Sequence, residues 1–186
     1  MRGLTVLLLL AVAAGAATPE VTESVKPNFF LSEWRVADLN GDGRDDLLIV
    51  GDEGEIRSWF ADPGTGKLEP RPRGGLKLPD PEYTLLAVAD ILGEGGPGQL
   101  VALSPAGAVA YRVGQDGAFA TEPVTLARRA RFRLRTNEPR MASITQDINN
   151  DGRPDLVVPG RDRTEIWING EKGLRRTARI TTDLDR

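Results

Sequence analysis

The segment DLNGDGRDDLLIV, residues 38 to 50, places five acidic or amide side chains around two glycines and then becomes apolar. Counted from Asp38, oxygen-bearing side chains stand at positions 1, 3, 5 and 9, and Gly43 stands at position 6. Glycine permits the sharp turn that such a short polar loop needs. A compact run of β-branched and aliphatic residues is typical of a buried strand. The segment therefore predicts a tight acidic loop that leads into a strand.

The same pattern recurs along the chain. Each copy has β-prone residues, a marker aspartate, a loop and then an apolar strand; the markers are Asp38, Asp90 and Asp147, in WRVADLNGDGRDDLLIV (34–50), LLAVADILGEGGPGQLVAL (85–103) and ASITQDINNDGRPDLVV (142–158). A fourth start appears in RITTDLDR, where Asp183 and Asp185 are placed as the first two polar residues of the opening segment. Such self-similarity indicates a repeat of about 36 to 40 residues, with insertions in the earlier copies.

The strands expected within the repeats are short, and no stretch sustains helical periodicity. We expect strands at 47–50, 55–60, 83–89, 156–158 and 165–168, with a hairpin turn at Asn169-Gly170. Repeated antiparallel units of this length suit β-propeller blades, so the predicted class is all-β and β-propeller-like. The predicted units are 32–84, 85–140 and 141–180, with the start of a further unit at 181–186. Propellers have ~4 to 8 blades, so we expect the remaining blades in a longer chain.

The first residues have the character of a targeting segment. Arg2 precedes the apolar run 4–14, and an Ala-Gly-Ala cleavage pattern follows at 14–16, which together predict a signal peptide over 1–17 and a linker over 18–31. The run is shorter than the ~20 residues of a membrane span, so no membrane span is predicted; a retained anchor is the rival interpretation. The expected location is secreted, periplasmic or extracellular.

Composition excludes several kinds of chemistry. The chain has no histidine and no cysteine, which removes Ser-His-Asp and Cys-His catalysis and every His-ligated metal site. It has no disulfide to stabilise it, and the net charge of −3 gives no sign of nucleic-acid binding. Only carboxylate, arginine, lysine, tyrosine or serine chemistry would remain. We expect no enzymatic activity of the chain's own.

The oxygen spacing predicts a cation site in two of the loops. Hard oxygen donors at alternate positions, with a backbone carbonyl at position 7, favour Ca²⁺. The predicted ligands are Asp38, Asn40, Asp42, Arg44 and Asp46 in the first loop and Asp147, Asn149, Asp151, Arg153 and Asp155 in the third. Position 12 is Ile49 or Val158 rather than the glutamate of a helical calcium hand. The alternative is that the loops are turns only. If they bind the ion, we expect its role to be to brace the blade loops.

The middle loop is expected to be empty, and Asp45 is expected to be a bystander. In the middle loop Leu92 aligns with Asn40 and Gly98 aligns with Asp46, which leaves only Asp90 and Glu94 as donors.

With strand, DxNxDGxxD loop and strand recurring from 32 to 186, the sequence resembles the FG-GAP and VCBS repeat family, which includes the integrin α-subunit propeller and many secreted bacterial proteins. The resemblance implies Ca²⁺ at the edges of blades. The literal Phe-Gly and Gly-Ala-Pro signatures are absent.

Three other groups of residues suggest ligands. RRARFRLR, 128–135, predicts a strand with arginines on one face, which fits either an anionic ligand or a solvated face. Trp34, Trp59 and Trp167 fit either core packing, which we favour for the last two, or a sugar platform. Glu53 and Glu55 are candidates for a glycosidase pair, although the sequence singles out no two carboxylates.

These observations predict an exported calcium-binding β-repeat protein that acts as a binding or scaffold module. The alternative is a carbohydrate-binding or carbohydrate-active propeller fragment, either a lectin or a polysaccharide-degrading enzyme. The expected partner is an unidentified protein or glycan ligand.

Overall fold

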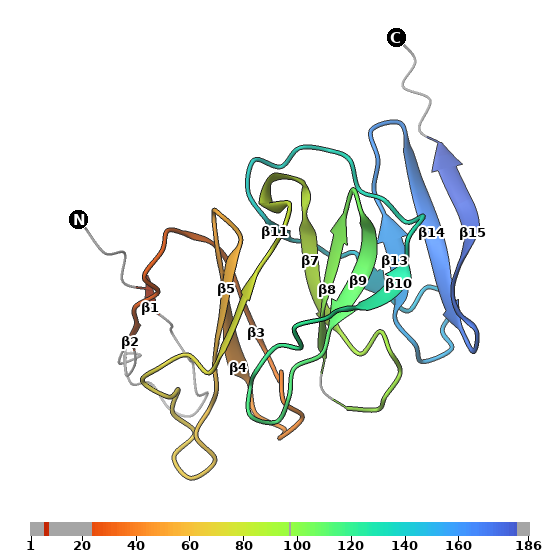
Figure 1. Cartoon of the computed structure of the whole chain (residues 1–186). Helices are drawn as coiled ribbons and strands as arrows, with labels where there is room; N and C mark the ends of the chain where they lie inside the picture. The colour runs from red at the N-terminus through yellow and green to blue at the C-terminus, as the bar shows by residue number, and fades with distance from the viewer. Residues whose placement is uncertain (1–5, 8–23, 97, 182–186) are drawn as a thin grey trace, which may run out of the picture.

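The computed structural model describes residues 6–7, 24–96 and 98–181. These residues form an all-β protein with one two-stranded ribbon and three larger sheets, as the sequence predicts (Figure 1). The only described part of the predicted signal peptide is β1 (Val6–Leu7), which pairs with β2 (Ser24–Val25). The rest of that peptide and the predicted fourth start at Asp183 and Asp185 lie outside the described residues.

Sheet I is an antiparallel meander. It contains β3 (Leu31–Ala37), β4 (Asp46–Gly51), β5 (Glu55–Trp59) and β6 (Gly74–Lys77), in that order. The turn between β4 and β5 closes with a hydrogen bond of 3.0 Å from the Gly54 N–H to the Gly51 carbonyl, and Gly54 has a φ of +85°. The predicted strands at 47–50 and 55–60 are therefore confirmed to within a residue or so.

Sheets II and III repeat this scheme. Sheet II consists of β7 (Leu85–Ala89), β8 (Gln99–Ser104), β9 (Gly107–Tyr111) and β10 (Val124–Ala127), preceded by the single turn η1 (Pro81–Tyr83) and extended by β11 (Arg140–Met141), which pairs parallel to β7. Sheet III consists of β12 (Thr145–Gln146), β13 (Asp155–Val158), β14 (Arg163–Gly170) and β15 (Gly173–Thr181). The unequal lengths of the intervening loops account for the unequal spacing of the marker aspartates.

Two local predictions were wrong. Asn169 pairs with Leu174 inside the β14–β15 ladder, so the hairpin turn is formed by Glu171 and Lys172 rather than by Asn169-Gly170. The segment 128–135 is not a strand, because it pairs with no sheet among the described residues. Its side chains still alternate at first, since Phe132 is buried between two exposed arginines, but Leu134 is 36% exposed.

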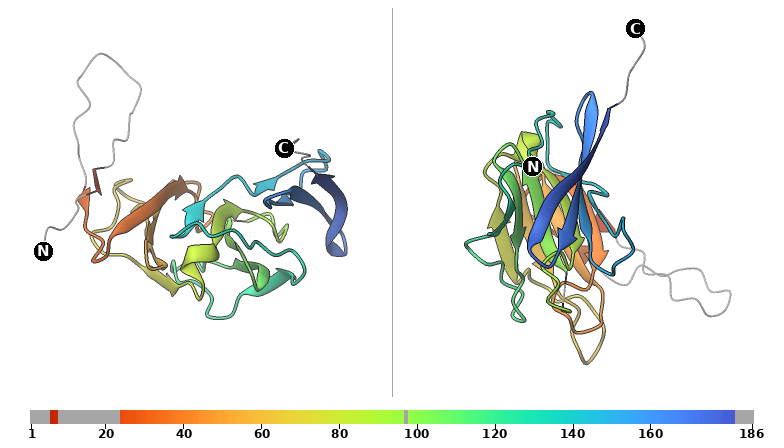
Figure 2. Two further views of the ribbon diagram at one scale, coloured as in Figure 1. Left: turned by 90° about the horizontal axis from the view of Figure 1, so that it is seen from above. Right: turned by 90° about the vertical axis from the view of Figure 1, so that its right-hand side faces the viewer.

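The three sheets pack face to face along the chain (Figure 2). Neighbouring residues of a strand point to opposite faces, so sheet II presents one face to sheet I and the other to sheet III. Leu48 and Val50 of sheet I pack with Leu100 of sheet II, whereas Val101 of sheet II packs with Leu156 of sheet III. The hydrophobic core therefore lies in the two layers between the sheets.

A third cluster covers the outer face of sheet I. Leu47, Ile49 and Trp59 pack there with Val25 and with the partly buried Phe29. Equivalent residues of the second strands, Leu47, Leu100 and Leu156, thus all point toward the layer on the N-terminal side of their sheet. The sheets also meet at the edges formed by their first strands: β11, which extends sheet II beside β7, contacts β3, and β12 contacts β7.

The tryptophans divide as expected between core and surface. Trp59 pairs across the sheet with Leu47, and Trp167 pairs with Leu156, so the two rings hold equivalent positions in sheets I and III. Both are buried, at 2% and 7% exposure, which confirms core packing. Trp34, on β3, is 51% exposed.

Candidate functional site

The acidic loops occupy the same place in each sheet, between its first and second strands. Residues 38–45 connect β3 to β4, and residues 147–154 connect β12 to β13. The segment 90–98 connects β7 to β8, with residue 97 outside the described part. All three loops lie at the lower end of the molecule in the view of Figure 1. Stacking of the repeats therefore brings the acidic segments to one side of the protein.

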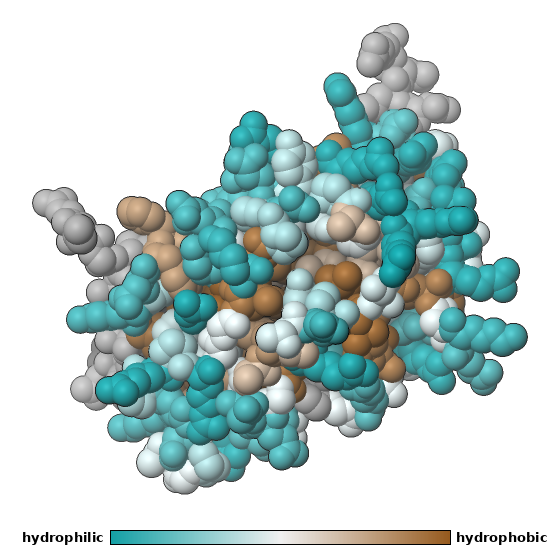
Figure 3. Space-filling model, viewed as in Figure 1, coloured by the Kyte–Doolittle hydropathy of each residue, from teal (hydrophilic) through white to brown (hydrophobic). Residues whose placement is uncertain are grey.

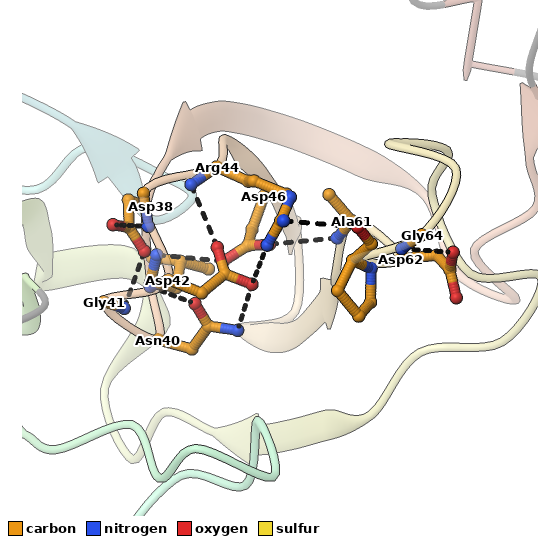
Figure 4. Close-up of polar contacts among 12 residues, drawn as sticks. Asp38, Asn40, Gly41, Asp42, Arg44, Asp46, Ala61, Asp62 and Gly64 are labelled. Atoms are coloured by element: carbon orange, nitrogen blue, oxygen red, sulfur yellow. Dashed lines mark hydrogen bonds and ion pairs between the residues drawn. The ribbon is translucent and has the colours of Figure 1, made fainter.

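The marker aspartate closes each loop by accepting hydrogen bonds from the loop backbone. In the first loop Asp38 Oδ1 accepts from the Gly41 N–H at 2.6 Å, and Oδ2 accepts from the Gly43 N–H at 2.9 Å (Figure 4). In the third loop Asp147 Oδ2 accepts from the Gly152 N–H at 2.8 Å. Gly43 and Gly152 have φ values of +79° and +85°, so the position-6 glycine has the predicted geometry.

The middle loop has the same shape although it lacks most of the predicted donors. Asp90 Oδ1 accepts from the Glu94 N–H at 3.1 Å, and Oδ2 accepts from the Gly95 N–H at 2.9 Å. Gly95 has a φ of +65° and lies five residues after its aspartate, as Gly43 does. The glycine and the marker aspartate thus define the loop in all three sheets.

Positions 3, 5 and 7 form a second layer of contacts in the first loop. Asn40 Oδ1 accepts from the Asp42 N–H at 3.0 Å, and Asp42 Oδ1 accepts from the Arg44 N–H at 2.9 Å. The Arg44 guanidinium lies 3.4 Å from Asp42 Oδ2 and donates to the Pro63 carbonyl at 3.2 Å. The positive charge of Arg44 therefore partly neutralises the loop, and its hydrogen bond to Pro63 links the loop to the segment that follows β5.

The third loop repeats the contacts of positions 3 and 5. Asn149 Oδ1 accepts from the Asp151 N–H at 3.2 Å, and the Asn149 amide donates to Asp151 Oδ2 at 2.8 Å. Asp151 Oδ1 accepts from the Arg153 N–H at 2.9 Å. Two segments more than a hundred residues apart thus fold into nearly the same polar network.

Position 9 differs from the others because its carboxylate is buried. Asp46 is 1% exposed; its Oδ2 accepts from the Leu39 N–H and its Oδ1 from the Ala61 N–H, both at 3.0 Å. Asp155 is fully buried and accepts from the Ile148 N–H at 2.9 Å and the Asn169 N–H at 2.8 Å. Each carboxylate joins the start of its loop to the end of the third strand, since Ala61 follows β5 and Asn169 lies near the end of β14. Sequence reasoning did not assign this structural role.

The middle repeat uses Gln99 for the same purpose. Gln99 is 3% exposed, and its Oε1 accepts from the Leu92 N–H at 3.1 Å, while its amide donates to Asp90 at 3.3 Å. The alignment of Gly98 with Asp46 was therefore wrong: the middle loop is one residue longer, and Gln99 holds the equivalent position. A neutral amide replaces the buried carboxylate in the one loop expected to bind no ion.

The loop carboxylates influence one another's charge. Burial raises the pKa of Asp46, the N–H groups of Ala61 and Leu39 lower it, and the charges of Asp42 and Asp38 raise it again, so that this pKa lies above its usual value. Loss of hydration raises the pKa of Asp42, but hydrogen bonds from the Arg44 N–H and the Asn40 amide outweigh it, and this pKa lies below its usual value. Asp42 is thus readily ionised beside a buried carboxylate that is harder to ionise.

The donor chemistry of the two loops fits a hard cation. A carboxylate oxygen that accepts one N–H keeps a second lone pair, so the internal hydrogen bonds do not exhaust the oxygens. In the described part of the chain no group of three or more acidic side chains converges closely enough to hold an ion in the present arrangement. Positions 1, 3 and 5 share an exposed or half-buried rim, whereas Asp46 and Asp155 lie behind it. In this structure the candidate ligand oxygens therefore accept hydrogen bonds from the backbone N–H groups of their own loop.

The two glutamates considered as a glycosidase pair have different surroundings. Glu53 is exposed in the β4–β5 turn. Glu55 is paired with Lys77, whose ammonium lies 2.7 Å from Oε1; this hydrogen bond lowers the pKa of Glu55, and burial raises it less. An ionised glutamate bound to lysine is poorly suited to act as a general acid.

In the described residues no helix is long and apolar enough to cross a membrane.

Comparison with known proteins adds no family to this picture. No protein-family model matches the chain, and no curated protein matches it significantly.

Proposed function

We propose that this chain is an exported calcium-binding β-repeat protein, a binding or scaffold module without catalysis of its own. The observation that carries the proposal is the repetition of one oxygen-rich loop. The first and third loops have the same spacing of side-chain oxygens. They also share the hydrogen bonds from the position-6 N–H to position 1, from the position-5 N–H to position 3 and from the position-7 N–H to position 5. Export rests on the signal-peptide character of residues 1–17.

The sheets are proposed to be blades of a β-propeller arc related to FG-GAP and VCBS repeats. Three features support this. Each sheet contains the same four-stranded meander, sheets II and III turn the same face to their predecessors, and successive sheets meet through the contacts of β11 with β3 and of β12 with β7. Loops at the ends of such strands lie together on one side, which is a suitable place for ligands shared by several blades.

The ion would be held by the two sets of ligands that the sequence predicts. Side-chain oxygens come from positions 1, 3, 5 and 9, and the carbonyl at position 7 completes each set, in Arg44 and Arg153. The carboxylates of Asp42 and Asp151 are on exposed residues, so packing does not prevent them from turning toward an ion. Bound calcium would supply positive charge among carboxylates that otherwise repel one another, and would brace the loop.

Thermal unfolding with and without calcium tests the proposal. A ligand that binds only the folded protein stabilises it by about 2.7 kcal/mol at a hundred times its Kd. For a chain of this size each kcal/mol raises Tm by about 2–4 °C. We expect Ca²⁺ to raise Tm relative to chelator, and the Asp42→Ala/Asp151→Ala double variant to lose most of that increase. Magnesium is expected to have a smaller effect.

A matched control removes two acidic residues that the proposal does not use. Asp45 and Glu171 are exposed, and Asp45 stands next to the ligand set without belonging to it. The Asp45→Ala/Glu171→Ala variant should keep the full calcium response. Identical melts in calcium and in chelator, or an equal loss of response in both double variants, would contradict the calcium assignment.

A further inference from the structure

An arginine-lined groove lies between sheet III and the segment 128–135, away from the acidic loops. It encloses about 420 Å³, which is within the range of small-ligand clefts. One wall carries Arg129, Arg131 and Arg133, and the other carries arginines of β14, β15 and the turn before β14. Hydrophilic side chains cover this side of the molecule over β14 and β15 (Figure 3). We call this feature the arginine groove.

The charges in the arginine groove are far from balanced. Seven arginines line it, against two acidic residues, Asp162 and Glu165. Glu165 Oε1 lies 3.1 Å from both Arg176 and Arg179, so one carboxylate serves two guanidinium groups. Within the described chain, the other five arginines form no ion pair with an acidic side chain; they are Arg129, Arg131, Arg133, Arg161 and Arg163.

The row of arginines on segment 128–135 is held in place by its own backbone and by buried neighbours. Phe132 is 2% exposed, and its N–H donates to the Ser104 carbonyl at 3.1 Å. Ala130 is fully buried and its N–H donates to the Ala127 carbonyl at 3.2 Å. Because these residues face inward, Arg131 and Arg133 are fixed with their side chains in the solvent. Arg135 pairs instead with Glu82 at 2.8 Å and does not line the groove.

We propose that the arginine groove binds a linear acidic polysaccharide through its carboxylate or sulfate groups. The planar guanidinium group matches such oxoanions with two parallel hydrogen bonds, and the groove contains no lysine. A row of separate charges is satisfied better by a polymer that repeats its anionic groups than by one small anion. The choice of a polysaccharide also rests on the proposed export, because acidic polysaccharides are polyanions that an exported protein meets outside the cell.

Other polyanions fit the arginine groove less well. None of its described lining residues is aromatic, so it offers no stacking platform for the bases of a single-stranded nucleic acid. Its apolar lining is limited to Leu134, Val158 and Pro159, of which Val158 is 4% exposed. A membrane surface is bound most firmly where apolar side chains enter the lipid as well. The groove shares no residue with the predicted calcium ligands, so this inference is independent of the calcium proposal.

Binding measurements with defined polymers test the proposal. The chain is titrated with fluorescent heparin oligosaccharides and polygalacturonate, in calcium and in chelator, at a temperature where it is folded in both. We expect binding to at least one of them at about 50 mM NaCl that weakens severalfold at about 300 mM, because salt screens exposed charges. The Arg131→Glu/Arg133→Glu variant should lose at least about tenfold in affinity.

A control variant changes the net charge equally but outside the groove. Lys67 and Arg71 are exposed in the loop between β5 and β6, and Lys67→Glu/Arg71→Glu should retain affinity within about twofold. Circular dichroism confirms that both variants fold. An equal loss of affinity in the control variant, or no binding to either polysaccharide, would overturn the proposal that the arginine groove is the binding site. Tighter binding to duplex DNA, to polyglutamate or to phosphatidylserine vesicles would overturn the assignment of the ligand.

Discussion

Asp46 and Asp155 combine two roles that the sequence presents as one. Their spacing places them in the predicted ligand sets, and their burial makes each of them an acceptor for two backbone N–H groups. Because a buried N–H without a partner costs about 1–3 kcal/mol, these carboxylates stabilise the fold whether or not an ion is present. Gln99 supports this distinction, since it accepts the equivalent N–H of Leu92 without a negative charge.

Replacing the buried carboxylate should therefore destabilise the protein in chelator. Asp46→Ala leaves the N–H groups of Leu39 and Ala61 unpaired, so we expect a loss of about 2–5 kcal/mol in the free energy of unfolding, measured by urea denaturation. Asp45→Ala, one residue earlier and exposed, should change it by less than about 0.5 kcal/mol. Equal stability of the two variants in chelator would show that Asp46 matters only as an ion ligand.

At the scale of the element, one carboxylate of the β14–β15 hairpin pairs with two arginines of the opposite strand. Glu165 lies opposite Arg179 in the ladder and contacts Arg176 as well. Burial raises the pKa of Glu165, but the hydrogen bond from Arg179 and the charge of Arg176 lower it more, and the pKa lies below its ordinary value. A carboxyl group whose pKa is lower in the folded chain stabilises the fold above its unfolded pKa.

The contribution of Glu165 should disappear in acid. It is fully present above about pH 4.5, the usual glutamate value, and is lost as the pH falls through the lower folded pKa. The difference in unfolding free energy between the native chain and Glu165→Gln should accordingly shrink as the pH is lowered from about 7 to about 3. Urea denaturation across this range measures it. A difference that stays constant or grows toward low pH would contradict the assignment.

The sequence predicts elements well where the repeat is strong and poorly where tertiary contacts decide. The apolar strands 47–50 and 156–158 follow from composition, and the position-6 glycines follow from the loop spacing. The shift from Gly98 to Gln99 could not be found by counting, because a one-residue insertion is visible only through the hydrogen bond to Leu92. Alternation in segment 128–135 reflects a buried Phe132 rather than a strand, since no neighbouring strand pairs with it.

At the scale of the whole molecule, stability depends on layers between sheets rather than on the sheets alone. Trp167 belongs to the cluster that joins sheets II and III, and Trp59 belongs to the cluster that covers the outer face of sheet I. Their equivalent registers mean that the same position of the repeat supplies a large side chain to the layer on the outer face of sheet I and to the layer between sheets II and III. A defect in one layer is transmitted to its neighbour because sheet II takes part in both inner clusters.

Removing either buried tryptophan should therefore destabilise the entire described fold. We expect Trp59→Ala and Trp167→Ala each to lose about 3–5 kcal/mol, and Trp34→Ala, which replaces a side chain that is 51% exposed, to stay within about 0.5 kcal/mol. Urea curves followed by far-ultraviolet circular dichroism should keep one cooperative transition. A two-step curve in which only part of the signal shifts would contradict a shared core.

Strand β15 has a further consequence for the behaviour of the protein in concentrated solution. It spans nine residues and, among the described residues, pairs only with β14, so its other side presents unpaired backbone groups at the edge of sheet III. Long exposed edges are templates for intermolecular pairing and aggregation. Arg175, Arg176 and Arg179 oppose such pairing, because a second copy in register would bring like charges together. The arginines of this strand thus help to keep copies of the protein from joining edge to edge.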